Sequence, residues 1–495
     1  MTETAKNHDG HLSWSSSRPT EVGESSCAVA SPPPRIISPC AQPERVRWYP
    51  DFFNFNVRAL QRKKHFINLV SLACIQVSNG VLPLLIYPFT LGVVGADLYA
   101  KVVLSEALSI FLLAIVLYSF EIDGVARVVE LTPEKDRDRL SQIFSAIFYL
   151  RMALFAVAAP LALLGALCVD EQLLPLTLCW LLVPLSYAVQ SNWLFLGLER
   201  NAPVALFTLL SRAGAVALVL FLVRERSDYA RVPLVIGLVY MAGAIGSLLY
   251  AQQRLGIRFV AVPRATLKQM LWSGKEIFAS NMSVILYRDV NVIVLGALGG
   301  SGAGVAAYSM AEKIVKAIQA SMRPLNQLFF LKALRIGRSA ERPGPAVLRQ
   351  LLRITWPQLA ALVVVLAILA AGYLALGPTI PWLQRIKNVD HIAALVGLMS
   401  LVALLGIPNF MLGWAGLNVL SAQRYLFGAI LATGLLSLAS CVVLVLRLGE
   451  NGAAICFVLA EALLLGLVVL RYLPPFFYAP KKTMSDSHCT LRKNP

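Results

Sequence analysis

Charged residues are scarce in this sequence: only 14% of its 495 residues are Asp, Glu, Lys or Arg, whereas 57% are hydrophobic. A soluble globular domain has about a quarter of its residues charged. The mean hydropathy of +0.68 leaves too little polar material to cover a surface in water. These proportions exclude a water-soluble protein and predict an integral membrane protein.

Cysteine and histidine are also scarce, with 8 and 5 residues. Cys27, Cys40 and Cys489 fall in polar terminal segments, and other cysteines fall in apolar segments. Neither residue type shows the spacing of a disulfide framework or of a zinc site. We therefore expect no metal ion and no cofactor.

Apolar segments are what the sequence has in abundance. About twelve of them reach the roughly 20 residues that a transmembrane helix needs. They cover approximately residues 67–91, 98–120, 143–167, 173–195, 204–223, 232–250, 277–298, 305–331, 354–376, 392–417, 425–446 and 453–473. The sequence thus predicts an all-α integral membrane fold with about twelve transmembrane helices.

Among the loops that join these segments, loops rich in Lys and Arg alternate with loops that have few or none. The basic residues cluster near Lys63, Arg137, Lys268 and Arg338, whereas the intervening loops VGAD, VDEQ and GGSGAG contain none. Basic loops of membrane proteins face the cytoplasm, so we expect both termini on that side. The net charge of +17 is then mostly an orientation signal, and we expect no nucleic acid as a partner.

Two stretches of the chain are similar to each other. LGVVGADLYAKVVLSEALSIF starts at Leu91, and LGALGGSGAGVAAYSMAEKIV starts at Leu295. Both begin with Leu-Gly-x-x-Gly and place a glutamate, Glu106 or Glu312, after a short turn. Chance similarity between apolar segments is the alternative explanation. An internal repeat would give two six-helix bundles related by a pseudo-two-fold axis along the membrane normal, with substrate bound between them.

This repeat and the composition predict five parts. Residues 66–255 and 276–473 form the N-terminal and C-terminal six-helix bundles, and residues 256–275 form a cytoplasmic linker between them. Residues 1–65 are rich in Ser and Pro, and residues 474–495 are short, polar and basic. Because neither end could pack into a core, we expect both to be disordered cytoplasmic tails.

Charged residues inside the predicted helices are the strongest indication of function. Each costs about 2.5–3.5 kcal/mol at the centre of an inserted helix, so such residues usually face a bundle interior or a watery cavity. The predicted substrate-binding residues are the basic side chains Arg288, Arg212, Lys313, Lys316 and Arg151. The predicted charge partners and gating or coupling residues are Asp289, Glu312, Glu106, Glu461, Gln76 and Asn79. Such a set predicts that the protein holds or moves something polar through a membrane.

Several of these residues have a second interpretation. Arg288 either contacts an anion, through its paired guanidinium donors, or neutralises Glu106 or Glu312 across the bundle. Lys313 and Lys316 lie three residues apart on one helix face and form either a cationic wall or a pair that extends to the outer interface.

The remaining candidates also leave two interpretations open. Arg212 lies mid-helix and adds positive charge to the passage, whereas Arg151 is closer to the cytoplasmic interface and could extend to it. Glu461 either couples transport to protons or is a structural hydrogen-bond partner. Gln76 and Asn79 precede two prolines, which indicates either a bent gating segment or ordinary helix packing.

Four stretches of sequence resemble one known family. They are LLIYPFTLGVVGADLYA from Leu84, NWLFLGLER from Asn192, FLVRERSDYARVPLV from Phe221, and DVNVIVLGALG to YSMAEKIVKAI from Asp289. In this order and spacing they resemble the polysaccharide-biosynthesis branch of the multidrug/oligosaccharidyl-lipid/polysaccharide (MOP) exporter superfamily, the Wzx-type O-antigen and exopolysaccharide flippases. The resemblance covers approximately residues 66–472. Leu91 stands where that family often has a basic residue, and QLFFLKAL lacks its usual proline.

The resemblance implies a fold and an activity. The fold is that of the MATE-like MOP transporters. The activity is translocation of an oligosaccharide repeat unit, linked to a polyprenyl pyrophosphate of the undecaprenyl type, from the cytoplasmic to the outer leaflet of a bacterial inner membrane. Alternating access through a cationic central cavity would move it toward lipopolysaccharide or exopolysaccharide assembly. The implied partners are this lipid-linked oligosaccharide, membrane lipids, and a polysaccharide polymerase with its chain-length regulator.

Two other classes of membrane protein remain as alternatives. A cation-coupled multidrug exporter of the same fold typically has a carboxylate in its first helix, and residues 69–91 contain none. A membrane polymerase or glycosyltransferase would carry a large extramembrane loop with clustered acids or arginines. The longest internal loops here are only about 20 residues and basic, so we expect a protein that is not an enzyme.

Overall fold

The computed structural model describes residues 55–80, 82–340, 343–380, 388–420 and 422–473. Within these ranges the regular structure is helical and contains no strand, which confirms the predicted all-α class. The described residues from 57 onward belong to one compact unit. Most of the predicted N-terminal tail and the C-terminal tail at 474–495, with Cys27, Cys40 and Cys489, lie outside the described residues.

The N-terminal half consists of ten α-helices and two short 3-10 turns among the described residues. They are α1 (Phe55–Gly80), α2 (Leu82–Val94), α3 (Ala96–Leu117), α4 (Phe120–Val128), α5 (Arg137–Val169), η1 (Glu171–Leu173), α6 (Leu174–Trp180), α7 (Leu182–Val189), α8 (Asn192–Gly197), α9 (Asn201–Leu222), η2 (Arg226–Ala230) and α10 (Arg231–Leu255). Gly95 separates α2 from α3 with a φ of 82°, a conformation that glycine adopts without steric cost. α1 begins within the predicted tail, at Phe55.

The C-terminal half follows the same pattern of long helices with short breaks. Its described elements are α11 (Arg264–Arg288), α12 (Val290–Ala297), α13 (Gly302–Ser321), α14 (Arg323–Ser339), α15 (Pro345–Leu376), η3 (Gly377–Thr379), α17 (Val389–Pro408), the π-helix η4 (Asn409–Leu417) and α18 (Gln423–Leu470). α11 begins at Arg264, so only residues 256–263 of the predicted linker lie between helices.

By length and composition, nine helices of the described residues can cross a membrane, or ten if the bent pair α11 and α12 forms one span. α13 overlaps the predicted segment 305–331 but carries Glu312, Lys313 and Lys316 within 20 residues, and so it is not one of these nine helices. α18 has 48 residues, about 72 Å of helix, and so exceeds twice the roughly 30 Å of a bilayer core. The chain is thus a multi-pass membrane protein.

α18 is a hairpin of two helices. Its backbone leaves the helical conformation at Gly449, with φ 59° and ψ −133°. Ser437 Oγ lies 3.4 Å from Cys456 Sγ, and Tyr425 donates a hydrogen bond of 2.6 Å to the Leu467 carbonyl. Each contact joins a residue before Gly449 to one after it, and the pair 425–467 encloses the pair 437–456 in sequence. The two arms therefore run antiparallel. α18 therefore contains both of the last two predicted spans.

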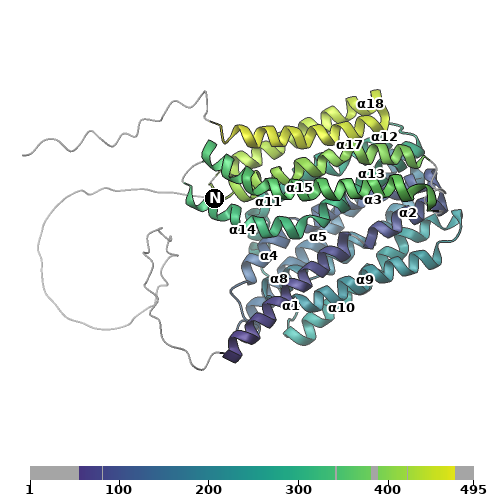
Figure 1. Cartoon of the computed structure of the whole chain (residues 1–495). Helices are drawn as coiled ribbons and strands as arrows, with labels where there is room; N and C mark the ends of the chain where they lie inside the picture. Colours follow the sequence, from purple (N-terminus) through teal and green to yellow (C-terminus); the bar gives the residue numbers. More distant parts are fainter. Residues whose placement is uncertain (1–54, 81, 341–342, 381–387, 421, 474–495) are drawn as a thin grey trace, which may run out of the picture. The chain divides into compact units, whose positions relative to one another are not determined.

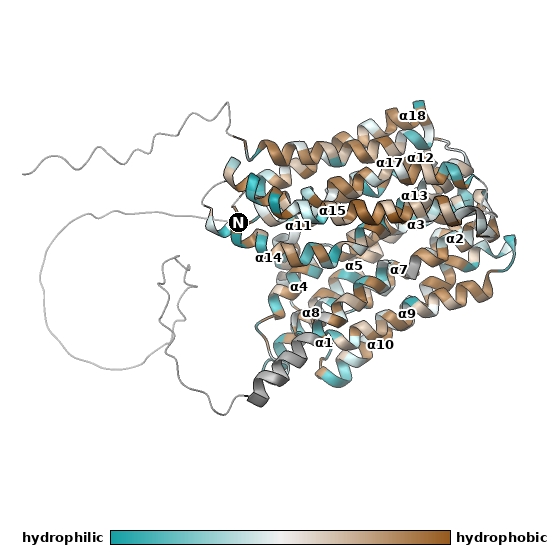
Figure 2. Cartoon of the chain, in the orientation of Figure 1, coloured by the Kyte–Doolittle hydropathy of each residue, from teal (hydrophilic) through white to brown (hydrophobic). Residues whose placement is uncertain are grey.

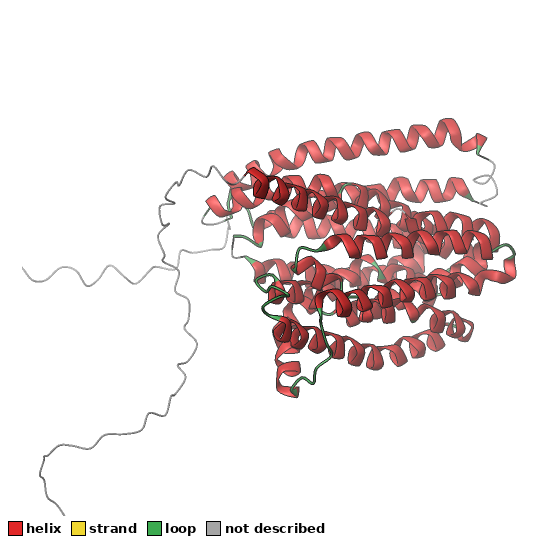
Figure 3. Ribbon diagram, turned by 90° about the horizontal axis from the view of Figure 1, so that it is seen from below, coloured by secondary structure: helices red, strands yellow, loops and turns green. Residues whose placement is uncertain are grey.

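Helices of each half pack mainly on one another (Figure 1). α10 packs on α7 and α9, and α3 on α5, whereas α13 packs on α17, and α18 on α11 and α17. The halves meet where α3 contacts α12 and α13. The helices run side by side (Figure 3). Brown apolar residues dominate the long helices (Figure 2), and large side chains such as Leu374 and Val157 are exposed, as expected of surfaces that lipid covers.

Candidate functional site

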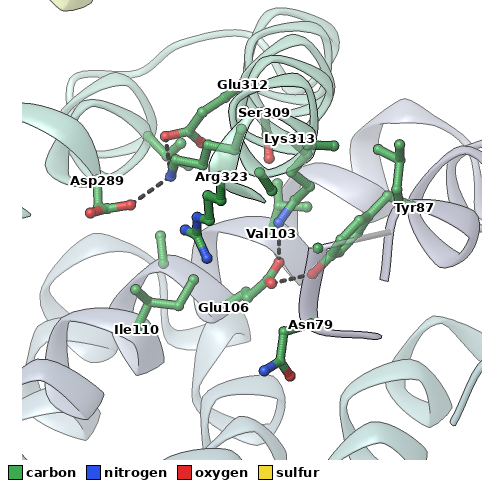
Figure 4. Close-up of a pocket in the computed structure, with 17 residues that line it drawn as sticks. Asn79, Tyr87, Val103, Glu106, Ile110, Asp289, Ser309, Glu312, Lys313 and Arg323 are labelled. Carbon is green, nitrogen blue, oxygen red and sulfur yellow. Dashed lines mark hydrogen bonds and ion pairs between the residues drawn. The ribbon is translucent and has the colours of Figure 1, made fainter. Parts of the chain in front are cut away.

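A polar cavity of about 340 Å³ lies where the two halves meet. Residues of α1, α2, α3, α12, α13 and α14 line it (Figure 4). Its ionisable lining residues are Glu106, Asp289, Glu312, Lys313, Lys316 and Arg323. Glu106 lies about 15 Å along α3 from its first residue, at 1.5 Å per residue, which is half the thickness of a bilayer core. With the first residue of α3 taken as one surface of the bilayer core, the cavity lies at mid-membrane depth.

A second cavity of about 660 Å³ adjoins the first. The two share Asp289, Lys316 and Arg323 as lining residues. Arg288 and Gln319 add further polar groups, and α11, α15, α17 and η4 contribute apolar ones. Together the cavities form one polar region that extends from the junction of the halves into the C-terminal half.

Lys313 reaches across from α13 to α3. Its Nζ lies 2.7 Å from Glu106 Oε2 and 3.7 Å from the centre of the Tyr87 ring. Tyr87 donates a hydrogen bond of 2.5 Å to the other Glu106 oxygen. The Lys313 and Glu106 side chains are only 14% and 8% exposed. Lys313 therefore points into the protein interior and not toward the outer interface.

Lys316 bridges two carboxylates of the C-terminal half. Its Nζ lies 2.5 Å from Asp289 Oδ1 and 2.8 Å from Glu312 Oε1. Asp289 stands at the bend between α11 and α12, and Glu312 lies one turn before Lys316 on α13. Two acids around one lysine leave this cluster with one net negative charge, so Lys316 is not a free cation.

Arg288 stands at the last residue of α11 and lines the second cavity. It donates a hydrogen bond of 2.5 Å to Gln319 Oε1, and its Nη1 lies 3.8 Å from Glu461 Oε1. Among the described residues, Glu461 is the carboxylate that pairs with it, not Glu106 or Glu312 as the alternative interpretation proposed. Arg288 is 28% exposed, so part of its guanidinium is open to the cavity.

Arg323 is a cavity residue that the sequence argument missed. It stands at the first position of α14, lines both cavities and extends into the first in Figure 4. Its Nη1 donates a hydrogen bond of 2.7 Å to Gln76 Oε1 of α1. No carboxylate of the described residues lies within 4.0 Å of it. The available signal was an Arg-Pro pair inside the predicted segment 305–331.

Arg212 is held by neutral groups of the N-terminal half. It donates hydrogen bonds to Asn79 Oδ1 at 3.0 Å and to the Tyr187 hydroxyl at 2.9 Å, and its guanidinium lies 3.3 Å from the centre of the Tyr240 ring. Asn79 lines the first cavity, but Arg212 is itself buried behind it. Arg212 thus supports the cavity wall and adds positive charge close to it.

Arg151 has the contacts of a structural residue. It is 1% exposed and lies 2.6 Å from Glu121 Oε1. It also donates hydrogen bonds to the backbone carbonyls of Tyr187 and Gln190. It lines neither central cavity. Arg212 lines neither cavity either, but it bonds to the cavity residue Asn79, whereas the hydrogen-bond partners of Arg151 line neither cavity.

Basic and acidic residues of the central region are equal in number. Four basic residues, Arg288, Lys313, Lys316 and Arg323, stand against the four acids Glu106, Asp289, Glu312 and Glu461. The expected cationic character is local. It resides in Arg323, which has no carboxylate within 4.0 Å among the described residues, and in Arg288, whose hydrogen-bond acceptor is neutral and whose carboxylate partner Glu461 lies 3.8 Å away. Among the described residues, no group of three or more His, Cys, Asp or Glu is placed to hold a metal ion.

A sequence profile for a family described as "Polysaccharide biosynthesis protein" matches residues 67–329, more than half of the chain. The chain belongs to this polysaccharide biosynthesis family. That membership confirms the resemblance predicted from the four sequence stretches.

Two curated relatives carry the name "Putative O-antigen transporter". The one from Escherichia coli (strain K12) is 24% identical over 279 residues, 56% of this chain and 65% of the relative. The one from Shigella dysenteriae is 23% identical over 269 residues, 53% of this chain and 66% of the relative. The chain thus spans slightly less than two thirds of the length of these relatives. Both names describe transporters and not enzymes, in agreement with the prediction.

Solved structures of low sequence identity share the fold of this member of the polysaccharide biosynthesis family. A multidrug resistance MATE family transporter of the MOP superfamily, in an inward-facing conformation, gives a TM-score of 0.56 at 13% identity and covers 82% of this chain and 96% of its own. A eukaryotic MATE transporter gives a TM-score of 0.51 at 14% identity, and the match covers 83% of this chain and 95% of the transporter. These matches confirm the predicted MOP fold.

Proposed function

We propose that this protein is a flippase for an oligosaccharide linked to a polyprenyl pyrophosphate. One observation carries the proposal: Arg288 and Arg323 face a mid-membrane cavity with amide oxygens, from Gln319 and Gln76, as their hydrogen-bond acceptors. An amide oxygen satisfies a guanidinium without neutralising it, and among the described residues the one carboxylate within 4.0 Å of either arginine is Glu461, 3.8 Å from Arg288 Nη1. Both arginines can therefore exchange a neutral acceptor for an anionic one, which binds more strongly.

A pyrophosphate suits these arginines for two reasons. Its oxygens match the planar fork of guanidinium donors, which can bind two of them at once. Its negative charges would otherwise be very costly at this depth in a bilayer, and two positive charges lower that cost. With a cytoplasm-negative membrane, each negative charge carried outward also gains about 2.3 kcal/mol per 100 mV.

Alternating access would require the contacts between the halves to break and reform. The pair Lys313–Glu106 and the hydrogen bond Arg323–Gln76 each join the two predicted bundles. A phosphate bound by Arg323 would displace Gln76 and so loosen one of these contacts. Substrate binding would in this way favour rearrangement of the halves, while the polyprenyl tail stays in lipid.

The remaining parts of the proposal follow from the family and the sequence pattern. We place the protein in a bacterial inner membrane with both termini in the cytoplasm, because loops rich in Lys and Arg alternate with loops that have fewer of them. The sugar repeat would be destined for a surface polysaccharide or exopolysaccharide. A polysaccharide polymerase and a chain-length regulator are the partners that such a pathway implies.

The test is genetic and biochemical. The gene is deleted in its host, and the membranes are analysed for polyprenyl-linked repeat units trapped on the cytoplasmic leaflet. We expect such trapping, full rescue by the wild-type gene, little rescue by Arg288→Ala and partial rescue by Arg288→Lys. Arg335→Ala, on the exposed face of α14, is the matched control and should rescue fully.

Two outcomes would overturn the proposal. Absence of trapped repeat units in the deletion strain would exclude a flippase role. Increased drug sensitivity of that strain, with normal surface polysaccharide, would instead favour the multidrug exporter alternative.

A further inference from the structure

Glu461 is a buried carboxylate with an unusual set of partners. It is 1% exposed, on the second arm of α18. Its Oε2 accepts a hydrogen bond of 2.7 Å from Asn409 Nδ2. Its Oε1 has no hydrogen-bond partner, and Arg288 Nη1 lies 3.8 Å away. The Asn409 amide oxygen, also buried, has no donor either. Two buried acceptors at this site thus lack a hydrogen-bond donor from the described residues.

The residues around Glu461 lie where the helices are irregular. Arg288 ends α11, and α12 continues after a bend of 49°. Asn409 is the first residue of the π-helix η4. Bends and π-helical turns are frequent at functional sites, since their backbone can adopt a second arrangement more readily than an α-helix can. The contact between Arg288 and Glu461 therefore joins two deformable points of the C-terminal half.

No second cation is placed to replace Arg288 beside Glu461. Among the described residues, Arg288 is the basic side chain within 4.0 Å of its carboxylate. Tyr287 of α11 also interacts with it electrostatically, and Asn409 of η4 carries no charge. On α18, Cys456 precedes Glu461 in sequence, and its Sγ donates a hydrogen bond to the Ser437 carbonyl. On α13 and at the α12 bend, Lys316 is held by Asp289 and Glu312.

We propose that Glu461 takes up a proton when a substrate phosphate draws Arg288 away from it. This inference rests on the proposed function, because it needs an anion that binds Arg288. Without Arg288, the Glu461 carboxylate would remain charged, buried and paired only with a neutral amide, a state that buried acids avoid by binding a proton. The proton would reside on Oε1 and would supply the donor that this site lacks.

The sign of the resulting pH dependence follows from linkage. The substrate-bound protein holds one more proton than the free protein, so a lower pH favours binding. Where the free protein has Glu461 charged and the complex has it protonated, affinity rises tenfold for each unit of decrease in pH. One substrate therefore enters the site together with one proton.

The experiment uses the full-length protein in lipid nanodiscs, with undecaprenyl pyrophosphate as the probe. Binding is measured between pH 6 and 8, and proton uptake is followed with a pH-sensitive dye in weak buffer. We expect one proton taken up per probe bound, beyond what the probe itself takes up. With Glu461→Gln we expect binding without this extra proton and with a flatter pH dependence. The proton uptake of the probe itself is the same in both experiments. The difference in proton uptake between the wild type and Glu461→Gln therefore measures protonation of Glu461.

A matched control and a second measurement complete the test. Glu450→Gln, at the turn of the α18 hairpin beside Gly449, should keep the extra proton. Infrared difference spectra of the wild type should show the carbonyl band of a protonated carboxylic acid on probe binding, a result that does not depend on the folding of any variant. Probe binding without extra proton uptake and without that band overturns the inference alone. Failure of the wild type to bind the probe overturns the proposed function as well.

Discussion

Lys313 of α13 and Glu106 of α3 form a largely buried ion pair, with Nζ 2.7 Å from Oε2, between the two halves of the chain. α3 and α13 are the helices that the internal sequence similarity relates to each other. Breaking a buried ion pair from one side is costly, about 3–5 kcal/mol, because the remaining charge stays buried without a partner. The pair is therefore suited to hold the halves in one arrangement until both charges find other partners.

Charge reversal tests this role. In Glu106→Lys, two lysines would face each other, and in Lys313→Glu, two glutamates would do so. We expect each single variant to lose most export and to be less stable. The double variant Glu106→Lys/Lys313→Glu restores an attractive pair and should regain part of both properties. Export is measured by complementation, and stability by thermal unfolding in detergent. A double variant as defective as the worse single variant would contradict a direct pairing role.

Helix positions could be predicted well from the sequence, for a simple physical reason. A bilayer requires about 20 apolar residues per helix whatever the neighbours are, so each span is recorded in one continuous segment. The hairpin α18 illustrates this, because its two predicted spans at 425–446 and 453–473 correspond to its two arms around Gly449. The start of α1 at Phe55 could not be predicted, since the residues before 66 lack an apolar run.

The pairing of the charges could not be predicted in the same way. The cost of burying charge indicated that Arg288, Lys313 and Lys316 face the interior, but a partner on another helix depends on the rotation and tilt of both helices. Arg288 pairs with Glu461, more than 170 residues away in sequence. Arg323 was missed because a basic residue near the expected end of a segment is indistinguishable from one at the cytoplasmic interface.

Arg323 should be as important for transport as Arg288. It lines both cavities, and Gln76 is its hydrogen-bond acceptor. Arg323→Ala removes a positive charge from the path of the phosphate, so we expect at least a tenfold loss of export, with partial recovery in Arg323→Lys. Arg335→Ala on the same helix serves as the control. Full export by Arg323→Ala, at wild-type protein levels, would show that the phosphate does not use this residue.

Arg151 should matter for stability and not for substrate binding. Arg151→Met leaves the carbonyls of Tyr187 and Gln190 without this donor, at a cost of about 1–3 kcal/mol for each group left unsatisfied. The side chain of Glu121 is 41% exposed, so its carboxylate stays hydrated when Arg151 is replaced. We expect a lower unfolding temperature and an unchanged affinity of the folded protein for undecaprenyl pyrophosphate. A weaker affinity at unchanged stability would restore Arg151 to the substrate-binding residues.

Gly274 marks a close crossing of α11 with the start of α4, again between the halves. A Cβ added at this position would lie 1.9 Å from Ser119 Oγ and 2.8 Å from Ser119 Cβ. Gly274→Ala must therefore push the helices apart, and we expect a loss of about 1–3 kcal/mol, seen as a lower unfolding temperature in detergent. Gly428→Ala, at a position with no heavy atom within 4 Å of the new Cβ, should be neutral or slightly stabilising. The two shortest contacts of the added Cβ are with the Ser119 side chain, and Asp123 Oδ2 follows at 2.9 Å, so Ser119→Gly in the Gly274→Ala background should recover part of the loss. An unfolding temperature of Gly274→Ala equal to that of Gly428→Ala would mean that this crossing is not tightly packed.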